Sequence, residues 1–493
     1  MRSTRLTRAV PLALLATLAT PALAMAQDEE PAASQVLGQL DLTWVIVATC
    51  LVFFMQAGFL LLEIGFSRGK NAGMGVAKIL VNFSIASIAW WAVGFAFAFG
   101  GAEKWLGTDS GFFAGFGNDM SGLAGDLYGE TFTGGTAAFM VFQFMFAAVS
   151  LAIVWGTTLE RMKFTAYIPF AIVFSAIIYP LIAHWGFGGG FFSADNFIGN
   201  GIQDFAGSSV VHLTGATAAL AALVFLGPRK GKYGPDGKPR AIPGHNMPLF
   251  GLGVVILWLG WFGFNGGSTL GTGDGRFAEV VMVTNLGAAG GVIGAMLLTQ
   301  LFLKTLDVGF IGNGAIAGLV AITAPSGYVE FWAAPIIGLI GGFIVVGGVL
   351  MFDRMRLDDP VGALSAHGLA GIWGTLACGF FTSDRLAETV GVGDPGLLYG
   401  GGFTQLGVQA LAVVATFVVV FALSAATFAV IKATIGLRVD EEDEIAGLDI
   451  SEHGMYGYPE QFIPQSELEG YGAAPTAPRV PAPAYSTQEV TAT

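Results

Sequence analysis

Long apolar runs alternate with short polar segments along almost the whole of this chain. Eleven of these runs have about the length that an α-helix needs to cross the hydrocarbon core of a bilayer. Helices are favoured there because they make all of their backbone hydrogen bonds within the segment. The runs lie approximately at residues 43–65, 74–100, 133–157, 165–186, 205–227, 247–267, 277–303, 309–325, 331–352, 360–382 and 403–432. The pattern therefore predicts an all-α polytopic membrane protein with eleven transmembrane helices.

The composition agrees with insertion into a membrane. Of the 493 residues, 54% are hydrophobic and only 12% are charged, about half the usual share for soluble proteins. The formal net charge of −13 gives no indication of nucleic-acid binding, and much of the acid lies near the C-terminus. The two cysteines, Cys50 and Cys378, fall inside apolar runs and are interpreted as small buried residues rather than a disulfide.

The first 26 residues have the layout of a cleavable signal peptide. Arg2, Arg5 and Arg8 precede a short apolar stretch that ends in Ala-Met-Ala, which predicts cleavage after Ala26. A signal peptide of this kind indicates a bacterial type of export. It also predicts that the mature N-terminus lies outside the cytoplasmic membrane.

The distribution of lysine and arginine gives an independent prediction of orientation. Positive residues are enriched in cytoplasmic loops, and an odd number of spans puts the two termini on opposite sides. With the N-terminus outside, the outer loops carry only Lys104, Arg276 and Arg385. The inner segments carry Arg68, Lys70, Lys78, Arg161, Lys163, Arg229, Lys230, Lys232, Lys238, Arg240, Lys304, Arg354, Arg356, Lys432 and Arg438. Both signals predict that the C-terminus is cytoplasmic.

The spans divide into two groups of five and a final helix. Residues 27–227 form the first half, and a cytoplasmic linker rich in Pro, Gly and Lys follows at 228–246. The second half and the eleventh span occupy 247–432. The cytoplasmic tail, 433–493, is first acidic and then rich in Pro, Ala and Thr, which predicts disorder from about residue 463.

Each half carries one histidine deep within its last span. His212 follows Asp204 by eight residues, and His367 follows Asp359 by the same number. Because five spans separate them, the two motifs run in opposite directions, which predicts an inverted five-helix repeat. Eight helical residues rise about 12 Å, so each aspartate would lie near one surface and each imidazole near the middle of the membrane. The two rings are therefore expected to meet.

The paired histidines allow more than one interpretation. Each could be a core residue that is satisfied by a neighbouring backbone group. A metal site is disfavoured, because neither His212 nor His367 has Cys, Asp or Glu nearby at ligand spacing. Two neutral imidazoles could instead line a narrow apolar pore for a small neutral solute that makes hydrogen bonds, since a bare ion would meet a large desolvation cost.

Two aromatic runs, FMVFQFMFAAVSL in the third span and WLGWFGFNGGSTLG in the sixth, permit similar alternatives. Most of the 41 phenylalanines are expected to pack against lipid or other helices. An aromatic ring at an outer opening can also attract a cation. Spacing alone does not distinguish Phe146 and Phe264 from their neighbours.

Several of these segments together resemble one known family. They are MQAGFLLLEIGFSRGKN, LERMKF, DFAGSSVVH, WFGFNGGS, DDPVGALSAHGLAGIWG and the tail segment GLRVDEEDEIAGLDISEHG, which occur in the family's order over about residues 40–457. On these motifs the chain is identified as a member of the ammonium transporter, methylammonium permease and Rhesus superfamily, of the bacterial type. The resemblance implies a homotrimer in the lipid bilayer, in which each subunit has its own pore.

The resemblance also implies roles for individual residues. The family recruits ammonium at an outer vestibule through a Trp, a Phe and a Ser, and Phe146 and Ser268 match the last two. Asp204 matches an aspartate that supports this site structurally. The recruitment Trp is replaced by Phe187 in the run HWGFGGG, while Trp185 stands two residues earlier. Phe is the weaker partner for a cation, which leaves the affinity open.

Deeper in the pore, Phe264 matches a gating Phe, and His212 and His367 match the family's twin histidines. The implied function is transport of ammonium or ammonia, with methylammonium as an analogue, by recruitment, deprotonation and conduction past the histidines. The alternative is an ammonium sensor with little or no transport, and gas conduction is a third possibility. No nucleophile–base pair or cofactor motif indicates an enzyme.

The tail and the inner surface give two further expectations. The resemblance implies that the acidic tail packs under the neighbouring subunit and couples the three pores, and that a PII-type nitrogen regulatory protein can plug their inner mouths. From the residues alone, a solvated acidic helix end is the alternative. Near the same surface, Glu63 and Glu160 are interpreted as anchors paired with Arg68 and Arg161 at helix ends.

Overall fold

The computed structural model describes residues 33–101, 103–108, 112, 135–196 and 199–462. The predicted signal peptide and the part of the tail that is predicted to be disordered lie outside these ranges. Within them the chain is almost entirely helical and contains no β-strand, which confirms the all-α class.

All eleven apolar runs are helical. The first five are α2 (Ala33–Phe66); α3 (Ala72–Ala89) continued by η2 (Trp90–Gly94) and α4 (Phe95–Phe99); α5 (Gly135–Thr157); α6 (Phe164–Val173) continued by η4 (Phe174–Ile178) and α7 (Tyr179–Gly186); and η5 (Ser208–Leu213) continued by α8 (Thr214–Leu226). The other six are α9 (Met247–Gly267), α10 (Arg276–Phe302), α11 (Val308–Thr323), α12 (Ala333–Arg354), η7 (Leu364–Leu369) continued by α13 (Ala370–Phe381), and α15 (Thr404–Thr434). Among the described residues, ten of these segments are long and apolar enough to cross a membrane, and α11 is a shorter apolar helix.

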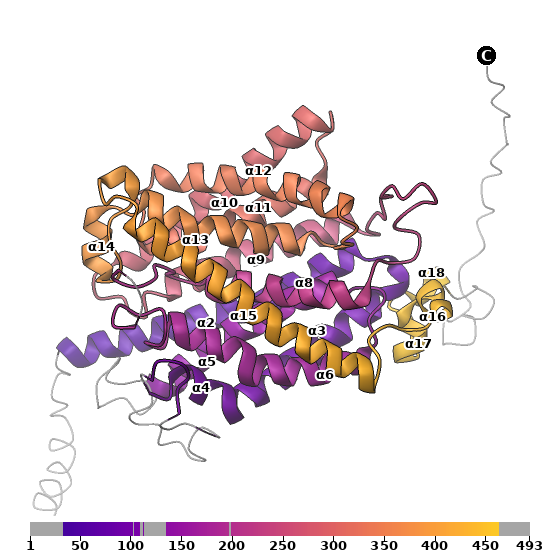
Figure 1. Ribbon diagram of the computed structural model, residues 1–493, viewed down its shortest axis with the longest axis horizontal. Coiled ribbons are helices and arrows are strands. Elements are labelled where there is room, and N and C mark those ends of the chain that lie inside the picture. Colours follow the sequence, from indigo (N-terminus) through magenta and orange to yellow (C-terminus); the bar gives the residue numbers. More distant parts are fainter. Residues whose placement is uncertain (1–32, 102, 109–111, 113–134, 197–198, 463–493) are drawn as a thin grey trace, which may run out of the picture.

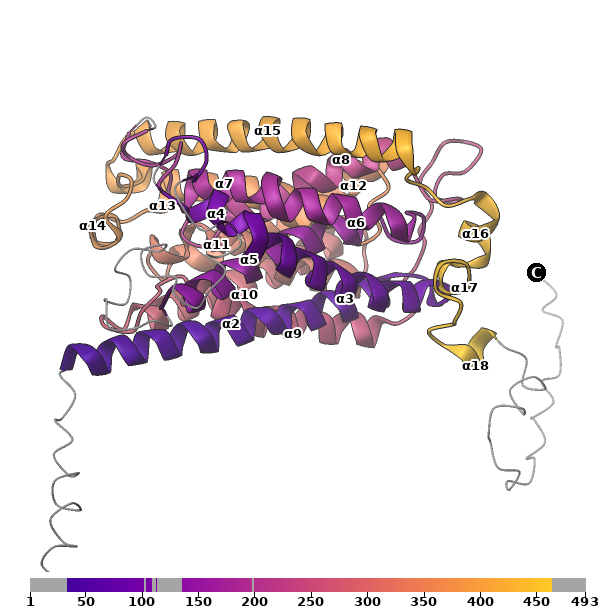
Figure 2. The same cartoon turned by 90° about the horizontal axis from the view of Figure 1, so that it is seen from below.

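The helices run roughly side by side along one axis of the molecule (Figure 1). Helix α2 begins at one end of this bundle, and the short helices α16 (Glu441–Ala446), α17 (Leu448–His453) and α18 (Pro459–Phe462) lie at the other, as both views show (Figure 2). We call the end with α16–α18 the tail end. The start of the first described helix and the last described helix therefore lie at opposite ends of the bundle, as an odd number of spans requires.

Glycines allow three of the helices to approach closely. A Cβ atom at Gly338 of α12 would lie 1.8 Å from the carbonyl oxygen of Gly287 in α10, and one at Gly342 would lie 2.2 Å from that of Gly291. A Cβ at Gly291 would in turn meet the Gly314 carbonyl of α11 at 2.1 Å. The backbones of α10, α11 and α12 therefore touch directly, as is typical of membrane helices that associate through small residues.

Four of the spans contain a π-helical segment. Two of these segments, η2 and η4, face each other across neighbouring spans, and the other two, η5 and η7, carry the histidines. A π turn widens the helix and is often found at functional positions. The two histidines thus occupy equivalent local structures in the two halves of the chain.

Candidate functional site

The two buried histidines meet in the interior of the bundle. The Nδ1 atoms of His212 and His367 lie 3.3 Å apart, and the centroids of their rings are separated by 5.3 Å. A hydrogen bond between two Nδ1 atoms requires one ring to donate and the other to accept, so the two rings must be opposite tautomers. The Nε2 atom of His212 has no hydrogen-bond partner in the described part of the chain.

An aspartate fixes the helix start that positions His212. Asp204 lies just before η5, and its Oδ1 atom accepts hydrogen bonds from the backbone N–H groups of Gly207 and Ser208 at 2.9 and 2.7 Å. Its Oδ2 atom accepts from the next two residues, Ser209 and Val210, both at 2.9 Å. One carboxylate therefore satisfies four of the backbone donors that the start of a helix leaves without partners.

The second half repeats this arrangement before η7. The Oδ1 atom of Asp359 accepts from the N–H groups of Val361 and Gly362 at 3.3 and 3.0 Å, and its Oδ2 atom accepts from Leu364 at 2.7 Å. Gly207 and Gly362 both have positive φ, of 110° and 75°, in the turn between aspartate and helix. Glycine adopts such angles without strain, which lets both turns close on the carboxylate.

Aromatic rings hold both imidazoles in place. The indole of Trp261 stacks on His212 with centroids 5.1 Å apart and planes inclined by 22°, and its Nε1 donates to Thr323 Oγ1 at 2.8 Å. The ring of Phe59 lies 6.2 Å from that of His367. The sequence analysis did not assign Trp261 to the site, because nothing in the pattern separates it from the other aromatic residues of its span.

A cavity of about 360 Å³ lies at the end of the bundle opposite the tail. Thr272, which follows α9 at this end, donates to Asp41 near the start of α2. Four of the residues that line this cavity are those that were expected to form an outer vestibule: Phe146, Phe187, Ser268 and Asp204. They come from separate segments of the chain. We call this cavity the vestibule.

Two stacked phenylalanines separate the vestibule from the histidines. The rings of Phe146 and Phe264 are 4.0 Å apart and nearly parallel, at 18°. Phe146 lines the vestibule, and the ring of Phe264 lies 5.5 Å from that of His212. Both side chains are almost fully buried, with exposed fractions of 1% and 0%. The two rings therefore lie between the vestibule and His212.

Phe187, which was expected from the resemblance to replace a tryptophan, is one of the residues that line the vestibule. Its ring centroid lies 6.5 Å from that of Phe146 in an edge-on arrangement. Trp185 packs instead against Trp105, to whose carbonyl oxygen its Nε1 donates at 3.0 Å. Trp185 is not among the residues that line the vestibule.

A second, much smaller cavity lies on the tail side of the histidines. Its volume is about 20 Å³, and His367, Phe59, Asn313 and Glu63 are among the residues that line it. The interpretation of Glu63 as an anchor paired with Arg68 is wrong, since Arg68 bonds to Glu160 and both carboxylate oxygens of Glu63 lack a hydrogen-bond partner among the described residues. Helix α2 ends at Phe66, so Arg68 has an extended backbone and does not continue the helix that carries Glu63.

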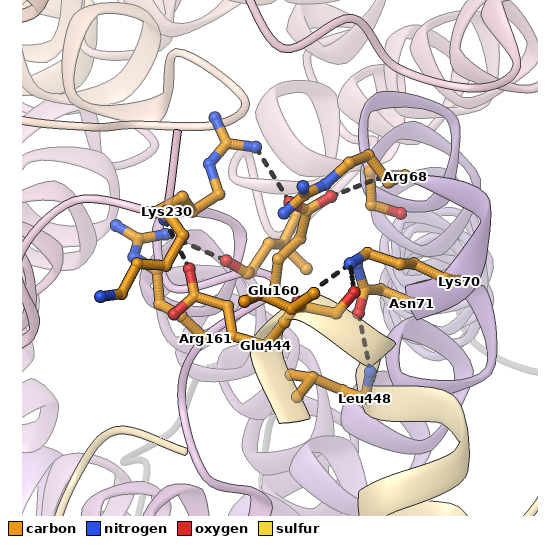
Figure 3. Close-up of polar contacts among 12 residues, drawn as sticks. Arg68, Lys70, Asn71, Glu160, Arg161, Lys230, Glu444 and Leu448 are labelled. Atoms are coloured by element: carbon orange, nitrogen blue, oxygen red, sulfur yellow. Dashed lines mark hydrogen bonds and ion pairs between the residues drawn. The ribbon is translucent and has the colours of Figure 1, made fainter. Parts of the chain in front are cut away.

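A compact group of ion pairs lies at the tail end of the bundle (Figure 3). The Glu160 carboxylate accepts a hydrogen bond from Arg68 at 2.8 Å and forms a salt bridge with Arg229 at 3.3 Å. Arg229 in turn forms a bidentate salt bridge with Asp358, with both contacts at 2.9 Å. Glu160 is thus an ion-paired residue, but its partners are Arg68 and Arg229 rather than Arg161. Burial raises the pKa of Asp358, but the hydrogen bonds and charge of Arg229 outweigh it and hold that pKa well below its usual range.

The first part of the tail binds to this surface through backbone and side chains. Lys70 donates to the carbonyl oxygens of Glu444 and Ile445, and Asn71 Oδ1 accepts from the Leu448 N–H at 2.9 Å (Figure 3). The Glu444 carboxylate accepts from the Lys230 N–H at 2.7 Å and pairs with Arg438 at the same distance. The acidic helices are therefore docked, in contrast to the solvated helix end that was the alternative.

The site thus consists of hydrogen-bonding and aromatic groups. Within the described ranges no three His, Cys, Asp or Glu side chains are close enough together to hold a metal ion. Along the axis of the bundle the order is vestibule, phenylalanine pair, histidine pair and the small cavity that contains Glu63. A neutral molecule that forms hydrogen bonds suits this interior better than a bare ion does.

Comparison with known proteins identifies the family. The model of the Ammonium Transporter Family matches residues 43–458. The chain is 43% identical to ammonium transporter Amt2 of Archaeoglobus fulgidus over 437 residues, covering 87% of this chain and 90% of that protein. It is 34% identical to an ammonium transporter of Bacillus subtilis over 425 residues, covering 85% and 98% of the two chains.

Solved structures agree with this assignment. A protein described as a sensor Amt protein superimposes with a TM-score of 0.75 at 35% identity and covers 85% of this chain and 99% of its own. Mep2 of Candida albicans gives a TM-score of 0.75 at 28% identity, with coverage of 87% and 92%. The chain therefore belongs to the ammonium transporter family.

Proposed function

We propose that this protein takes ammonium from the vestibule and conducts it, as ammonia, past the His212–His367 pair. The observation that carries this proposal is the position of the two bonded imidazoles between a polar vestibule and a second cavity. The relatives named above are ammonium transporters, and the site as described contains no nucleophile–base arrangement, so we propose no enzymatic reaction.

Recruitment of the cation rests on three kinds of contact in the vestibule. The faces of Phe146 and Phe187 attract a cation through their ring electrons. The Ser268 hydroxyl donates to the Phe264 carbonyl oxygen at 2.8 Å, which leaves its own lone pairs free to accept a hydrogen bond from ammonium. Asp204 contributes negative charge from the floor of the vestibule while its oxygens are held by backbone N–H groups.

Deprotonation follows from the cost of entering the apolar segment. An ammonium ion between the Phe146 and Phe264 rings would lose its water, whereas neutral ammonia loses little by comparison. Because the two Nδ1 atoms bond to each other, the pair offers the passing ammonia one bare Nε2 atom that accepts a hydrogen bond and, on the other ring, one Nε2–H group that donates one. This assigns substrate contact to His212 and His367, gating to Phe146 and Phe264, recruitment to Phe187 and Ser268, and support of the site to Asp204.

The membrane and its sides are also part of the proposal. The charge distribution supports a location in the bacterial cytoplasmic membrane with the vestibule outside and the tail end inside. The chain is proposed to be divided as the sequence suggests, into the signal peptide 1–26, halves at 27–227 and 247–432, the linker 228–246 and the tail 433–493. Three subunits are proposed to form a homotrimer, each with its own pore.

The docked tail supports a regulatory role at the inner surface. Helices α16 and α17 bind across α3 and the residues that precede it, and Glu444 also reaches the loop between α8 and α9 at Lys230. A regulator of the PII type that displaced these contacts would act directly on the inner ends of the pore-forming helices.

A sensor role is the alternative, and two observations favour it. One structural neighbour is described as a sensor Amt protein, and in this chain Phe187 stands where the stronger cation partner is expected. Currents evoked by ammonium on solid-supported membranes, together with labelled methylammonium uptake into proteoliposomes, distinguish the two. We expect uptake; ammonium binding with neither uptake nor current would contradict transport and favour the sensor.

A further inference from the structure

Glu63 is a buried acidic residue that has no role in the proposed pathway described above. Its exposed fraction is 1%, and neither of its carboxylate oxygens has a hydrogen-bond partner within the described ranges. Burial of a carboxyl group without partners is expensive, and such groups usually have a specific cause. Glu63 lies in α2, which supplies no other charged residue to this part of the interior.

The carboxyl group faces the small cavity that it shares with His367. A cavity needs roughly 10–15 Å³ to hold one water molecule, so the 20 Å³ here has room for a single molecule of that size. Ammonia is of similar size. A molecule in this cavity is within reach of only a few polar groups, because the rest of the lining is apolar apart from Asn313, whose Nδ2 already donates to the Val361 carbonyl oxygen at 2.9 Å.

The surroundings keep the carboxyl group in this position. A Cβ atom at Gly156 would lie 3.4 Å from Glu63 Oε1 and 2.9 Å from a methyl group of Val361, so the glycine provides the space that the acid occupies. The positive charge of Lys78 in α3 acts on Glu63 electrostatically, without a hydrogen bond between the two side chains. Its Nζ donates to the Trp155 carbonyl oxygen at 2.8 Å and lies 4.6 Å from the ring of Tyr167.

We propose that Glu63 is the inner proton-exchange group of the pore, which returns a proton to ammonia as it leaves the histidine pair. The inference rests on the proposed function. It adds an acid–base site that lies on the opposite side of the histidines from the vestibule, where the geometry places a titratable oxygen next to a cavity for one molecule.

The proton is conserved in this scheme. Ammonium loses a proton on the vestibule side: an N–H bond breaks, and a water molecule there accepts the proton and passes it to the Nε2 atom of His212, which has no partner among the described residues. The proton shared by the two Nδ1 atoms then shifts from His212 to His367, and the Nε2–H group of His367 releases its proton towards the small cavity. The two rings return to their starting tautomers before the next turnover. The Glu63 carboxylate accepts that proton, an O–H bond forming, and then gives it up to the lone pair of ammonia. The products are ammonium and the original carboxylate, so each turnover moves one positive charge.

The test compares the full-length protein with Glu63→Gln, Glu63→Asp and the control Glu388→Gln, all in proteoliposomes. Glu388 is exposed on α14 (Asp384–Val390) and lies outside the pathway. The first readout is the infrared difference spectrum recorded with and without ammonium chloride. A band from a carboxyl group that changes protonation is expected in the wild type, in Glu63→Asp and in Glu388→Gln, and it should be missing from Glu63→Gln.

The second readout is the ammonium-evoked current. Removal of a positioned proton-transfer group commonly lowers a rate on the order of 100-fold, so Glu63→Gln should lose most of the current while Glu63→Asp retains a measurable part. An unchanged carboxyl band in Glu63→Gln, or a current equal to that of Glu388→Gln, would overturn the inference. Failure of the proposed function has a different signature, because the wild type would then show neither current nor uptake whatever its infrared spectrum.

Discussion

His212 and His367 are 155 positions apart in the chain, yet their Nδ1 atoms lie 3.3 Å apart in the interior of the bundle. Each histidine sits in a six-residue π segment, and each segment begins after an aspartate that accepts its first N–H groups. The meeting of the two rings therefore depends on two local structures that are built in the same way in the two halves.

The first prediction concerns the aspartate that starts η5. In Asp204→Asn one acceptor oxygen becomes an NH2 group that faces two backbone donors. Each unsatisfied buried donor costs about 1–3 kcal/mol, so this variant should be clearly less stable and should transport poorly. Thermal unfolding in detergent and methylammonium uptake measure the two effects. The matched control is Asp274→Asn on an exposed loop, for which we expect wild-type values.

The second prediction concerns recruitment. A tryptophan is a better cation partner than phenylalanine, and such contacts are worth about 0.5–1 kcal/mol at partly exposed sites, or about two- to fivefold in affinity. Phe187→Trp should therefore lower the KM for methylammonium by about this factor, and Phe187→Ala should raise it. Phe403→Trp, at a position that is 72% exposed, serves as the control. An unchanged KM in both Phe187 variants would remove this residue from the recruitment site.

The third prediction concerns the docked tail. Glu444 is buried and bonds both the Lys230 N–H and Arg438, whereas its neighbour Glu442 is exposed. Glu444→Gln should increase amide hydrogen exchange across α16 and α17, while Glu442→Gln should not. Deletion of residues 439–493 should alter the transport rate and its response to nitrogen status. If neither changes, the tail has no regulatory role.

The fourth prediction is a pH dependence of stability. The pKa of Asp358 in the folded protein lies below its unfolded value of about 3.9, so the pair with Arg229 stabilises the fold above that pH and ceases to do so as the pH falls further. The difference in Tm between the wild type and Asp358→Asn should be constant from about pH 8 to pH 5 and shrink below about pH 4. A difference that grows on acidification would contradict the assigned direction.

The length and polarity of the apolar runs were sufficient to predict the eleven helices. The equal spacing of Asp204 to His212 and of Asp359 to His367 predicted that the two rings approach each other. The vestibule residues were different, because Phe146, Phe187 and Ser268 come from separate segments, and only the resemblance to a family joined them.

Glu63 shows why sequence proximity was misleading at the inner end. Arg68 follows it after five residues, which suggested an ion pair at the helix end. The helix stops at Phe66, however, and Arg68 reaches Glu160 on another segment. Which partner a buried charge finds depends on helices that meet only in the folded protein, and a pattern along one span does not contain that information.

Uptake of labelled methylammonium by the double variant His212→Ala, His367→Ala tests the central claim most directly. The protein must first be shown to be folded and monodisperse. Losing the hydrogen bonds that the imidazoles offer to the solute raises the barrier by about 1–3 kcal/mol, so uptake should fall about 5- to 150-fold. Full uptake, with unaltered selectivity between ammonium and methylammonium, would contradict a pathway past these two rings.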